Sequence, residues 1–193
     1  MESRLTTSTA LRLATVGEPA VEHPAFQREE EEVVALFDDF RDPLLRYVLG
    51  IGLTIADGEE IIQEVFLSLF QHLRRGKSRS NLRGWLFRVA HNLALKRRYQ
   101  TLRSGQSTAE TSAAEVSVLD PAPNPEDQLL NNQVQRRLLA VFHALPEQDR
   151  RCISLRAEGL RYREIAEVLD MSLGAVSLSL TRSLARVARA AER

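Results

Sequence analysis

Apolar residues recur at helical spacing along most of this chain, and no stretch alternates with the period of two that a strand requires. In the clearest case, starting at Ile61, large apolar residues fall at i, i+1, i+4, i+5, i+8, i+9 and i+12. Such a stripe covers one broad face of a helix, and this apolar face is buried from water when the helix packs against other helices. We therefore expect an all-α fold.

Charge separates along the same part of the chain. Residues 29–64 contain eleven acidic and two basic side chains, whereas residues 74–100 contain nine basic and no acidic ones. The two segments thus carry formal charges of −9 and +9, although the whole chain, with 26 basic and 26 acidic residues, is neutral. This pattern predicts a basic surface for a polyanion and an acidic surface for a basic protein partner.

Composition excludes several other classes of protein. The 193 residues, 44% hydrophobic and 27% charged, suit a soluble protein of two small domains. The single cysteine, Cys152, cannot form an internal disulfide or a cysteine metal cluster, and it favours a reducing, cytoplasmic compartment. The apolar run at 10–16 is too short and too polar for a secretory signal or a membrane span.

Chemistry-bearing motifs are missing as well. The histidines lie scattered without the spacing of metal ligands, and the sequence has no glycine-rich phosphate loop, nucleophile elbow or prominent carboxylate pair. We therefore expect no metal, no cofactor, no catalytic residue and no enzymatic activity.

The pattern divides the chain into four segments. Residues 1–28 show no apolar period and are interpreted as a disordered tail. Residues 29–101 form a first helical domain. Residues 102–127, rich in Ser, Thr, Ala and Pro, are expected to be a flexible linker, and residues 128–193 form a second helical domain.

In the first domain, Pro43 interrupts the first apolar pattern, which predicts either two helical pieces or one kinked helix. Asp57, followed by Glu60, resembles a capping pair at the start of the helix with the apolar stripe. A basic loop is predicted at 74–80, and Ser80 or Asn81 caps the helix that follows it.

The second domain carries the spacing of a helix-turn-helix. A short helix over 162–169, a turn through 170–172 and a final helix place their apolar residues so that the two helices pack together. Ala166 is small where the helices must approach closely, and Ser172 can cap the final helix, whose first turns would enter a major groove.

Four segments follow one another in the chain: ADGEEIIQEVF at 56–66, NLRGWLFRVAHN at 81–92, LPE at 145–147 and EIAEVL at 164–169. In sequence, order and spacing they resemble the sigma factors of bacterial RNA polymerase. The resemblance is to the small extracytoplasmic-function (ECF) group, which retains only sigma domains two and four. It covers residues 32 to about 189.

The resemblance implies a promoter-specificity subunit. Its acidic helix would dock on the clamp coiled coil of the largest polymerase subunit, and its basic loop and helix would capture and open the minus-ten element. The second domain would read the minus-thirty-five element and sit on the polymerase flap. An anti-sigma factor is a further candidate partner, and the free protein is expected to be a monomer.

The resemblance and the charge pattern together select three sets of residues. The core-polymerase surface is predicted to comprise Asp57, Glu60, Gln63 and Glu64. The minus-ten surface is predicted to comprise Arg74, Arg75, Lys77, Arg79, Asn81, Arg83, Arg88, Asn92, Lys96, Arg97 and Arg98. The helix-turn-helix surface is predicted to comprise Arg161, Tyr162, Ser172, Ala175, Ser177, Ser179, Arg182 and Arg186.

One segment departs from the family. Where relatives usually read GTVKSRL in the recognition helix, this chain reads GAVSLSL at 174–180, so Thr, Lys and Arg on the DNA side become Ala, Ser and Ser. This change predicts weak independent minus-thirty-five selectivity, and it leaves Leu178 available to a protein partner. The alternative to a sigma factor is a sigma-like regulator that binds DNA or protein without forming a productive holoenzyme.

Overall fold

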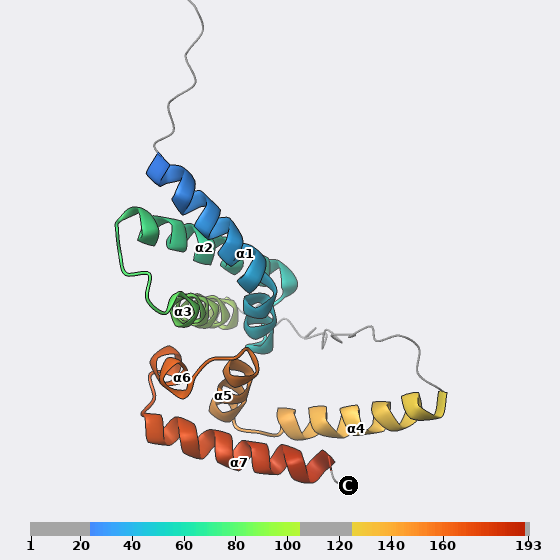
Figure 1. Cartoon of the computed structure of the whole chain (residues 1–193). Coiled ribbons are helices and arrows are strands. Elements are labelled where there is room, and N and C mark those ends of the chain that lie inside the picture. The colour runs from blue at the N-terminus through green and yellow to red at the C-terminus, as the bar shows by residue number, and fades with distance from the viewer. Residues whose placement is uncertain (1–23, 105–124, 192–193) are drawn as a thin grey trace, which may run out of the picture.

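The structure, a computed structural model, describes residues 24–104 and 125–191, with side chains from 28 and 133 onward in the two ranges. Within these ranges every regular element is a helix, which confirms the all-α prediction (Figure 1). The helices are α1 (Pro24–Gly50), α2 (Ile55–Arg74), α3 (Leu82–Arg103), α4 (Pro125–His143), α5 (Glu147–Ala157), α6 (Tyr162–Leu169) and α7 (Leu173–Ala191).

The predicted tail and linker lie largely outside the described residues. Helix α1 begins at Pro24, so the last residues assigned to the tail are helical. Helix α3 continues to Arg103, and α4 begins at Pro125, so both ends of the predicted linker are helical too. The domain boundaries therefore stay predictions.

Helices α1, α2 and α3 form the first domain. Helix α1 passes through Pro43 as one element, which excludes two separate pieces. Its buried Leu44 and Val48 pack with the α2 stripe and with Phe87 of α3 in the same core. Each such side chain contributes about 1.5–3 kcal/mol by leaving water. Gly58 allows α1 and α2 to approach, because a Cβ there would lie 2.8 Å from Leu45 Cδ1.

The start of α2 differs from the prediction. Thr54, not Asp57, is the N-cap: its backbone is extended, and its Oγ1 accepts a hydrogen bond from the Asp57 amide at 3.1 Å. Asp57 lies in the first turn, where its carboxylate accepts the Thr54 hydroxyl at 2.7 Å and favours the positive end of the helix dipole. The prediction placed the cap three residues too late, because a Thr-x-x-Asp pair satisfies the first amides equally well.

The second domain contains the predicted helix-turn-helix. Asp170 ends α6 in the left-handed conformation (φ 53°), and the Met171 amide bonds back to the Ala166 carbonyl at 2.9 Å. Ser172 caps α7 by accepting the Ala175 amide at 3.2 Å, as predicted. Val176 and other apolar residues of α6 and α7 are fully buried between the helices.

The two domains pack directly on each other. Helix α6 lies against α3, and α5 lies against the C-terminal half of α1, so the second domain sits beneath the first in Figure 1. The buried apolar residues of both domains belong to one contiguous cluster. Among the described helices, none is long and apolar enough to cross a membrane.

Candidate nucleic-acid interface

The acidic surface of α2 is smaller than its sequence suggests. Glu60, Gln63 and Glu64 are exposed, but Arg97 reaches across from α3 and pairs with Asp57 at 3.0 Å and with Glu60 at 2.7 Å. The hydrogen bond to Glu60 raises the pKa of Arg97. Arg97 was assigned to the minus-ten surface, but in this structure its guanidinium is engaged with the acidic residues of α2, and its role at the minus-ten element stays a prediction.

Leu67 lies on the same face of α2 and was not among the predicted residues. At 100° per residue, Glu60, Gln63, Glu64 and Leu67 occupy the face of α2 opposite its buried stripe. Leu67 is 57% exposed. The signal was present in the sequence: Leu67 falls outside the positions of the inner stripe and one turn beyond Gln63.

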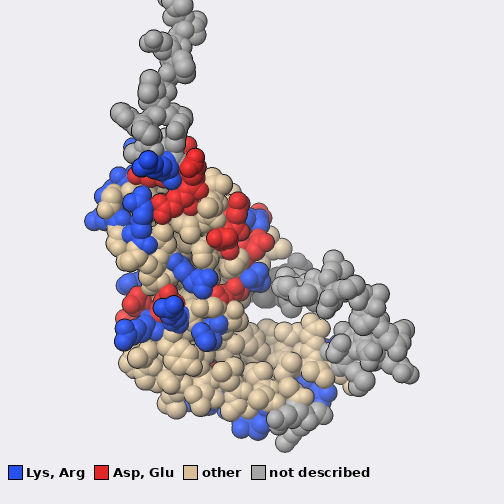
Figure 2. Space-filling model, in the orientation of Figure 1, with Lys and Arg blue, Asp and Glu red and all other residues tan. Residues whose placement is uncertain are grey.

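The connection between α2 and α3 carries much of the exposed positive charge. Figure 2 shows basic atoms gathered at the left edge beside this connection, with acidic atoms to their right over α1 and α2. Arg75 and Lys77 are exposed, and the Arg74 guanidinium lies 5.6 Å from the centre of the Phe70 ring. Arg79 pairs with Glu32 of α1 at 2.9 Å.

Asn81 closes this connection. It adopts the left-handed conformation (φ 56°), and its Oδ1 accepts the Gly84 amide at 3.2 Å, so it caps α3 as predicted. Gly84 is required for this cap, because a Cβ there would lie 2.5 Å from the Asn81 side-chain nitrogen. The side chain of Asn81 is thus already used in positioning α3.

The outer face of α3 is a continuous basic stripe. Arg88, Asn92 and Lys96 are exposed at four-residue intervals, opposite the buried face of the helix. Two residues that sequence analysis did not select continue the same line: Tyr99, which is 62% exposed, and Arg103, whose guanidinium lies 5.7 Å from the Tyr99 ring centre. These five residues are called the α3 stripe below.

Arg83 and Arg98 do not belong to the α3 stripe. Arg83 lies over the Phe40 ring and donates from Nη1 to the Gly159 carbonyl at 3.3 Å, and Arg98 pairs with Glu147 of α5. Both arginines lie on the side of α3 that faces the second domain. In this structure α5 and α6 occupy that side of α3, so the minus-ten role of both arginines stays a prediction.

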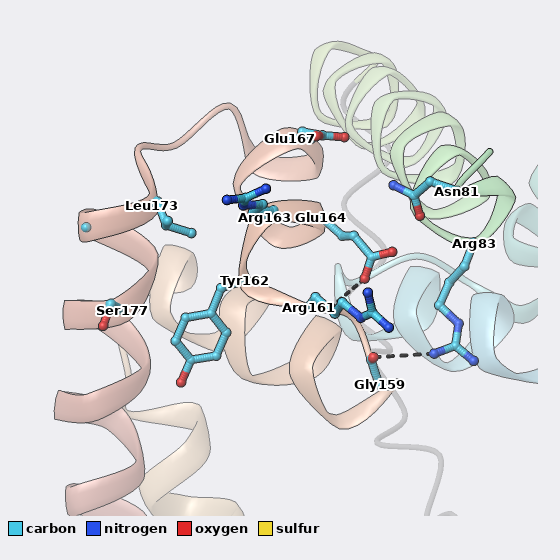
Figure 3. Close-up of a pocket in the computed structure, with 11 residues that line it drawn as sticks. Asn81, Arg83, Gly159, Arg161, Tyr162, Arg163, Glu164, Glu167, Leu173 and Ser177 are labelled. Carbon is cyan, nitrogen blue, oxygen red and sulfur yellow. Dashed lines mark hydrogen bonds between the residues drawn. The ribbon is translucent and has the colours of Figure 1, made fainter. Parts of the chain in front are cut away.

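A cleft of about 1130 Å³ lies between the start of α3 and the helix-turn-helix. Arg161, Tyr162 and Arg163 line one part of it, with Ser177 of α7 opposite and Arg83 at the α3 side (Figure 3). Arg161 offers no side-chain cap to α6; the Glu164 carboxylate instead accepts the Arg161 amide at 2.6 Å. The Arg161 side chain is exposed and can reach a phosphate.

The exposed face of α7 has little charge. Ala175, Ser177, Leu178 and Arg186 are exposed, and Leu178 is 64% exposed. The region of α7 and α4 in Figure 2 is mostly uncharged in that view. Recognition of base edges usually needs long polar side chains such as Arg, Asn or Gln, which this face lacks in its first turns.

Two α7 residues that were predicted to face DNA are engaged within the second domain in this structure. Ser179 is buried, and its hydroxyl donates to Oδ1 of the buried Asp149 at 2.7 Å. Arg182 Nη2 lies 3.2 and 3.0 Å from the two oxygens of the same carboxylate. The family's recognition-helix pattern had placed Ser179 on the DNA side, but its partner Asp149 lies thirty residues away in sequence, where no local pattern reveals it.

Comparison with known proteins decides the family. Residues 36–103 match Sigma-70 region 2, and residues 135–187 match Sigma-70 region 4. The ECF RNA polymerase sigma-E factor of Escherichia coli K12 is 30% identical over 136 residues, which cover 66% of this chain and 70% of that protein. The chain belongs to the ECF sigma factors.

Other relatives agree with this membership. The ECF sigma-E factor of Haemophilus influenzae is 29% identical over 135 residues, covering 66% of this sigma factor and 70% of its own length. The fold resembles the solved structure of the sigma factor RpoE with the anti-sigma factor NepR from Bartonella quintana. That likeness has a TM-score of 0.58 at 16% identity, covering 86% of this chain and 98% of that one.

A second structural neighbour is CnrH in complex with the cytosolic domain of CnrY, with a TM-score of 0.56 at 19% identity. It covers 86% of this chain and 90% of the other. These two structural likenesses concern the fold. The matches to Sigma-70 regions 2 and 4 and the sigma-E relatives show that the protein is a sigma factor that directs transcription initiation, with region 2 in the first domain and region 4 in the second.

Proposed function

We propose that the first domain binds core RNA polymerase through the face of α2 that carries Glu60, Gln63, Glu64 and Leu67. The observation that carries this proposal is the position of these side chains on one exposed helix face, opposite the core. An exposed leucine beside carboxylate and amide groups offers both apolar area and charge complementarity to a basic protein surface. We propose the clamp coiled coil of the largest polymerase subunit as that surface, which is what the family resemblance implies.

We further propose that the α3 stripe holds the minus-ten strand. Arg88, Lys96 and Arg103 would contact phosphates, which supply affinity without reading sequence. Tyr99 presents an exposed ring on which an unpaired base can stack, and such stacking is worth about 1–3 kcal/mol per base. A basic helix face with an interleaved aromatic suits single-stranded DNA, which is what an opened promoter presents.

The second domain is proposed to contact the minus-thirty-five element and the polymerase flap. Arg161 and Arg186 are available for phosphates, but Ala175 and Ser177 are too short for bidentate base contacts. Promoter choice then rests mainly on the first domain. The exposed Leu178 favours a protein on the same helix face, either the flap or an anti-sigma factor.

Competition for core polymerase tests the docking surface. A fluorescent sigma factor of known affinity is bound to core, and the unlabelled wild-type chain should displace it. Glu64→Lys should displace it much less well, because it places a positive charge on a face that meets a basic partner. Glu31→Lys makes the same charge change on exposed α1 and should compete like wild type.

Equal competition by all three chains would overturn the assignment of the α2 face. Failure of the wild-type chain to displace the labelled sigma factor would instead favour the sigma-like regulator that forms no productive holoenzyme. Helix content by circular dichroism should be the same in all three chains, since the substituted side chains are exposed.

A further inference from the structure

Helix α5 holds the first domain at both of its ends. At its C-terminal end, Glu158 receives a two-pronged contact from Arg46 of α1, with Nε to Oε1 at 3.1 Å and Nη2 to Oε2 at 2.9 Å. This hydrogen bond raises the pKa of Arg46. The carbonyl of the next residue, Gly159, accepts a hydrogen bond from Arg83 of α3. Paired forks of this kind are the stronger class of ion pair.

The N-terminal end of α5 repeats the arrangement. The Glu147 carboxylate accepts hydrogen bonds from Arg98 of α3 and from Arg151 of its own helix, the latter at 2.7 Å. Burial alone would raise the pKa of the Glu147 carboxyl, but these arginines lower it below its ordinary value. The three contacts made by Arg46, Arg83 and Arg98 with α5 and the turn after it are called the clasp below.

The apolar and buried groups beneath the clasp are continuous across the domains. Arg151 of α5 lies close enough to Tyr47 and His91 of the first domain for its charge to lower the pKa of both groups. Burial is the larger effect at both groups: it raises the pKa of Tyr47 and lowers the pKa of His91 to about 4. The clasp therefore closes over a packed interface.

This closed arrangement conflicts with simultaneous binding of both promoter elements. Positions minus ten and minus thirty-five are about 25 base pairs apart, which is on the order of 85 Å of B-DNA. Helices α3 and α7 are only about 33 and 29 Å long, and α6, which adjoins α7, packs directly on α3. The domains must separate before each reaches its element.

We infer that the clasp is an autoinhibitory contact, in which carboxylates and a carbonyl at the two ends of α5 hold arginines of the first domain until polymerase and DNA separate the domains. The inference rests on the proposed function. Glu147 and Glu158 provide the negative charge that promoter phosphates would otherwise offer to Arg98 and its neighbours. Opening releases Arg83 and Arg98 on the side of α3 that faces the second domain.

Charge reversal and charge swap at one pair test the inference. Arg46 and Glu158 belong to neither proposed DNA surface nor to the polymerase surface. In the full chain without DNA or polymerase, Arg46→Glu and Glu158→Arg should each increase the radius of gyration in small-angle scattering at low salt. The double variant with both changes restores opposite charges and should return to the wild-type radius.

A second readout uses a random-sequence single-stranded oligonucleotide as the probe. Glu158→Gln should bind it more tightly than wild type by roughly two- to fivefold, the worth of one partly exposed ion pair. Glu167→Gln removes the same charge from a residue that makes no ion pair within the described part of the chain, and it should gain less.

Wild-type radii in both single variants, or failure of the double variant to restore compactness, would overturn the clasp. Equal gains in oligonucleotide affinity for Glu158→Gln and Glu167→Gln would also overturn it, because charge alone would then explain the effect. The scattering result needs neither polymerase nor promoter, so it is read independently of any failure of the proposed function.

Discussion

Replacing Asp149 by alanine should destabilise the second domain through the recognition helix. Asp149 is 4% exposed and accepts both the Ser179 hydroxyl and the Arg182 guanidinium. Removal leaves the buried Ser179 hydroxyl without an acceptor, which costs about 1–3 kcal/mol. Arg182 is half exposed, so water can hydrate its guanidinium once the carboxylate is gone, and the lost ion pair costs only about 0.5 kcal/mol. The expected loss is about 1.5–3.5 kcal/mol.

Urea unfolding followed by circular dichroism measures this loss. Ser179→Ala should cost only about 1 kcal/mol, because Asp149 keeps its contact with Arg182. The same variant should leave oligonucleotide affinity unchanged, since the hydroxyl faces the interior. A loss below about 0.5 kcal/mol for Asp149→Ala, or a clear drop in DNA affinity for Ser179→Ala, would refute the reasoning that this cluster holds α7 in place.

Three further outcomes follow from the first domain. Replacing Arg88 and Lys96 by alanine should lower the log-log salt slope of single-stranded DNA binding by roughly 0.7 per lost phosphate contact, measured by anisotropy titration; an unchanged slope would remove these residues from the α3 stripe's role. Gly84→Ala should displace the Asn81 cap and cost about 1 kcal/mol in thermal unfolding, and a neutral result would show that the cap tolerates a methyl group. In the folded chain the buried His91 has a pKa of about 4, below the usual 6.5. Between these two pH values the unfolded chain therefore binds more protons than the folded chain. The free energy of unfolding should fall by up to about 3 kcal/mol as pH drops from 6.5 to 4. Urea midpoints across that range check the sign, and His91→Asn should flatten the profile.

Short-range sequence patterns predicted much of the fold. Helical spacing predicted α6 at its observed bounds, and Gly159 ends α5 with a positive φ of 85°, as a glycine after a helix suggests. Ser172 caps α7 as its place before the final helix implied. These features depend on residues within one or two turns, which is the range over which sequence patterns inform.

Contacts between distant segments were not predictable in the same way. Arg97 and Arg98 are adjacent in a basic run, yet one turns to the acids of α2 and the other to α5. Net charge along the chain says nothing about which side of α3 each neighbour covers. The buried carboxylate of Asp149 likewise has partners about thirty residues away. Tyr99, by contrast, could have been found by continuing the outer stripe of α3 one turn further.

Run-off transcription with purified core polymerase tests the central claim most directly. Genomic fragments are transcribed by core polymerase alone, with the wild-type chain, and with the Glu64→Lys variant. The account predicts discrete transcripts that require the wild-type chain and fall sharply with the variant. Transcripts that are absent with the wild-type chain, or identical with core polymerase alone, would contradict the assignment of this chain as a sigma factor that directs initiation.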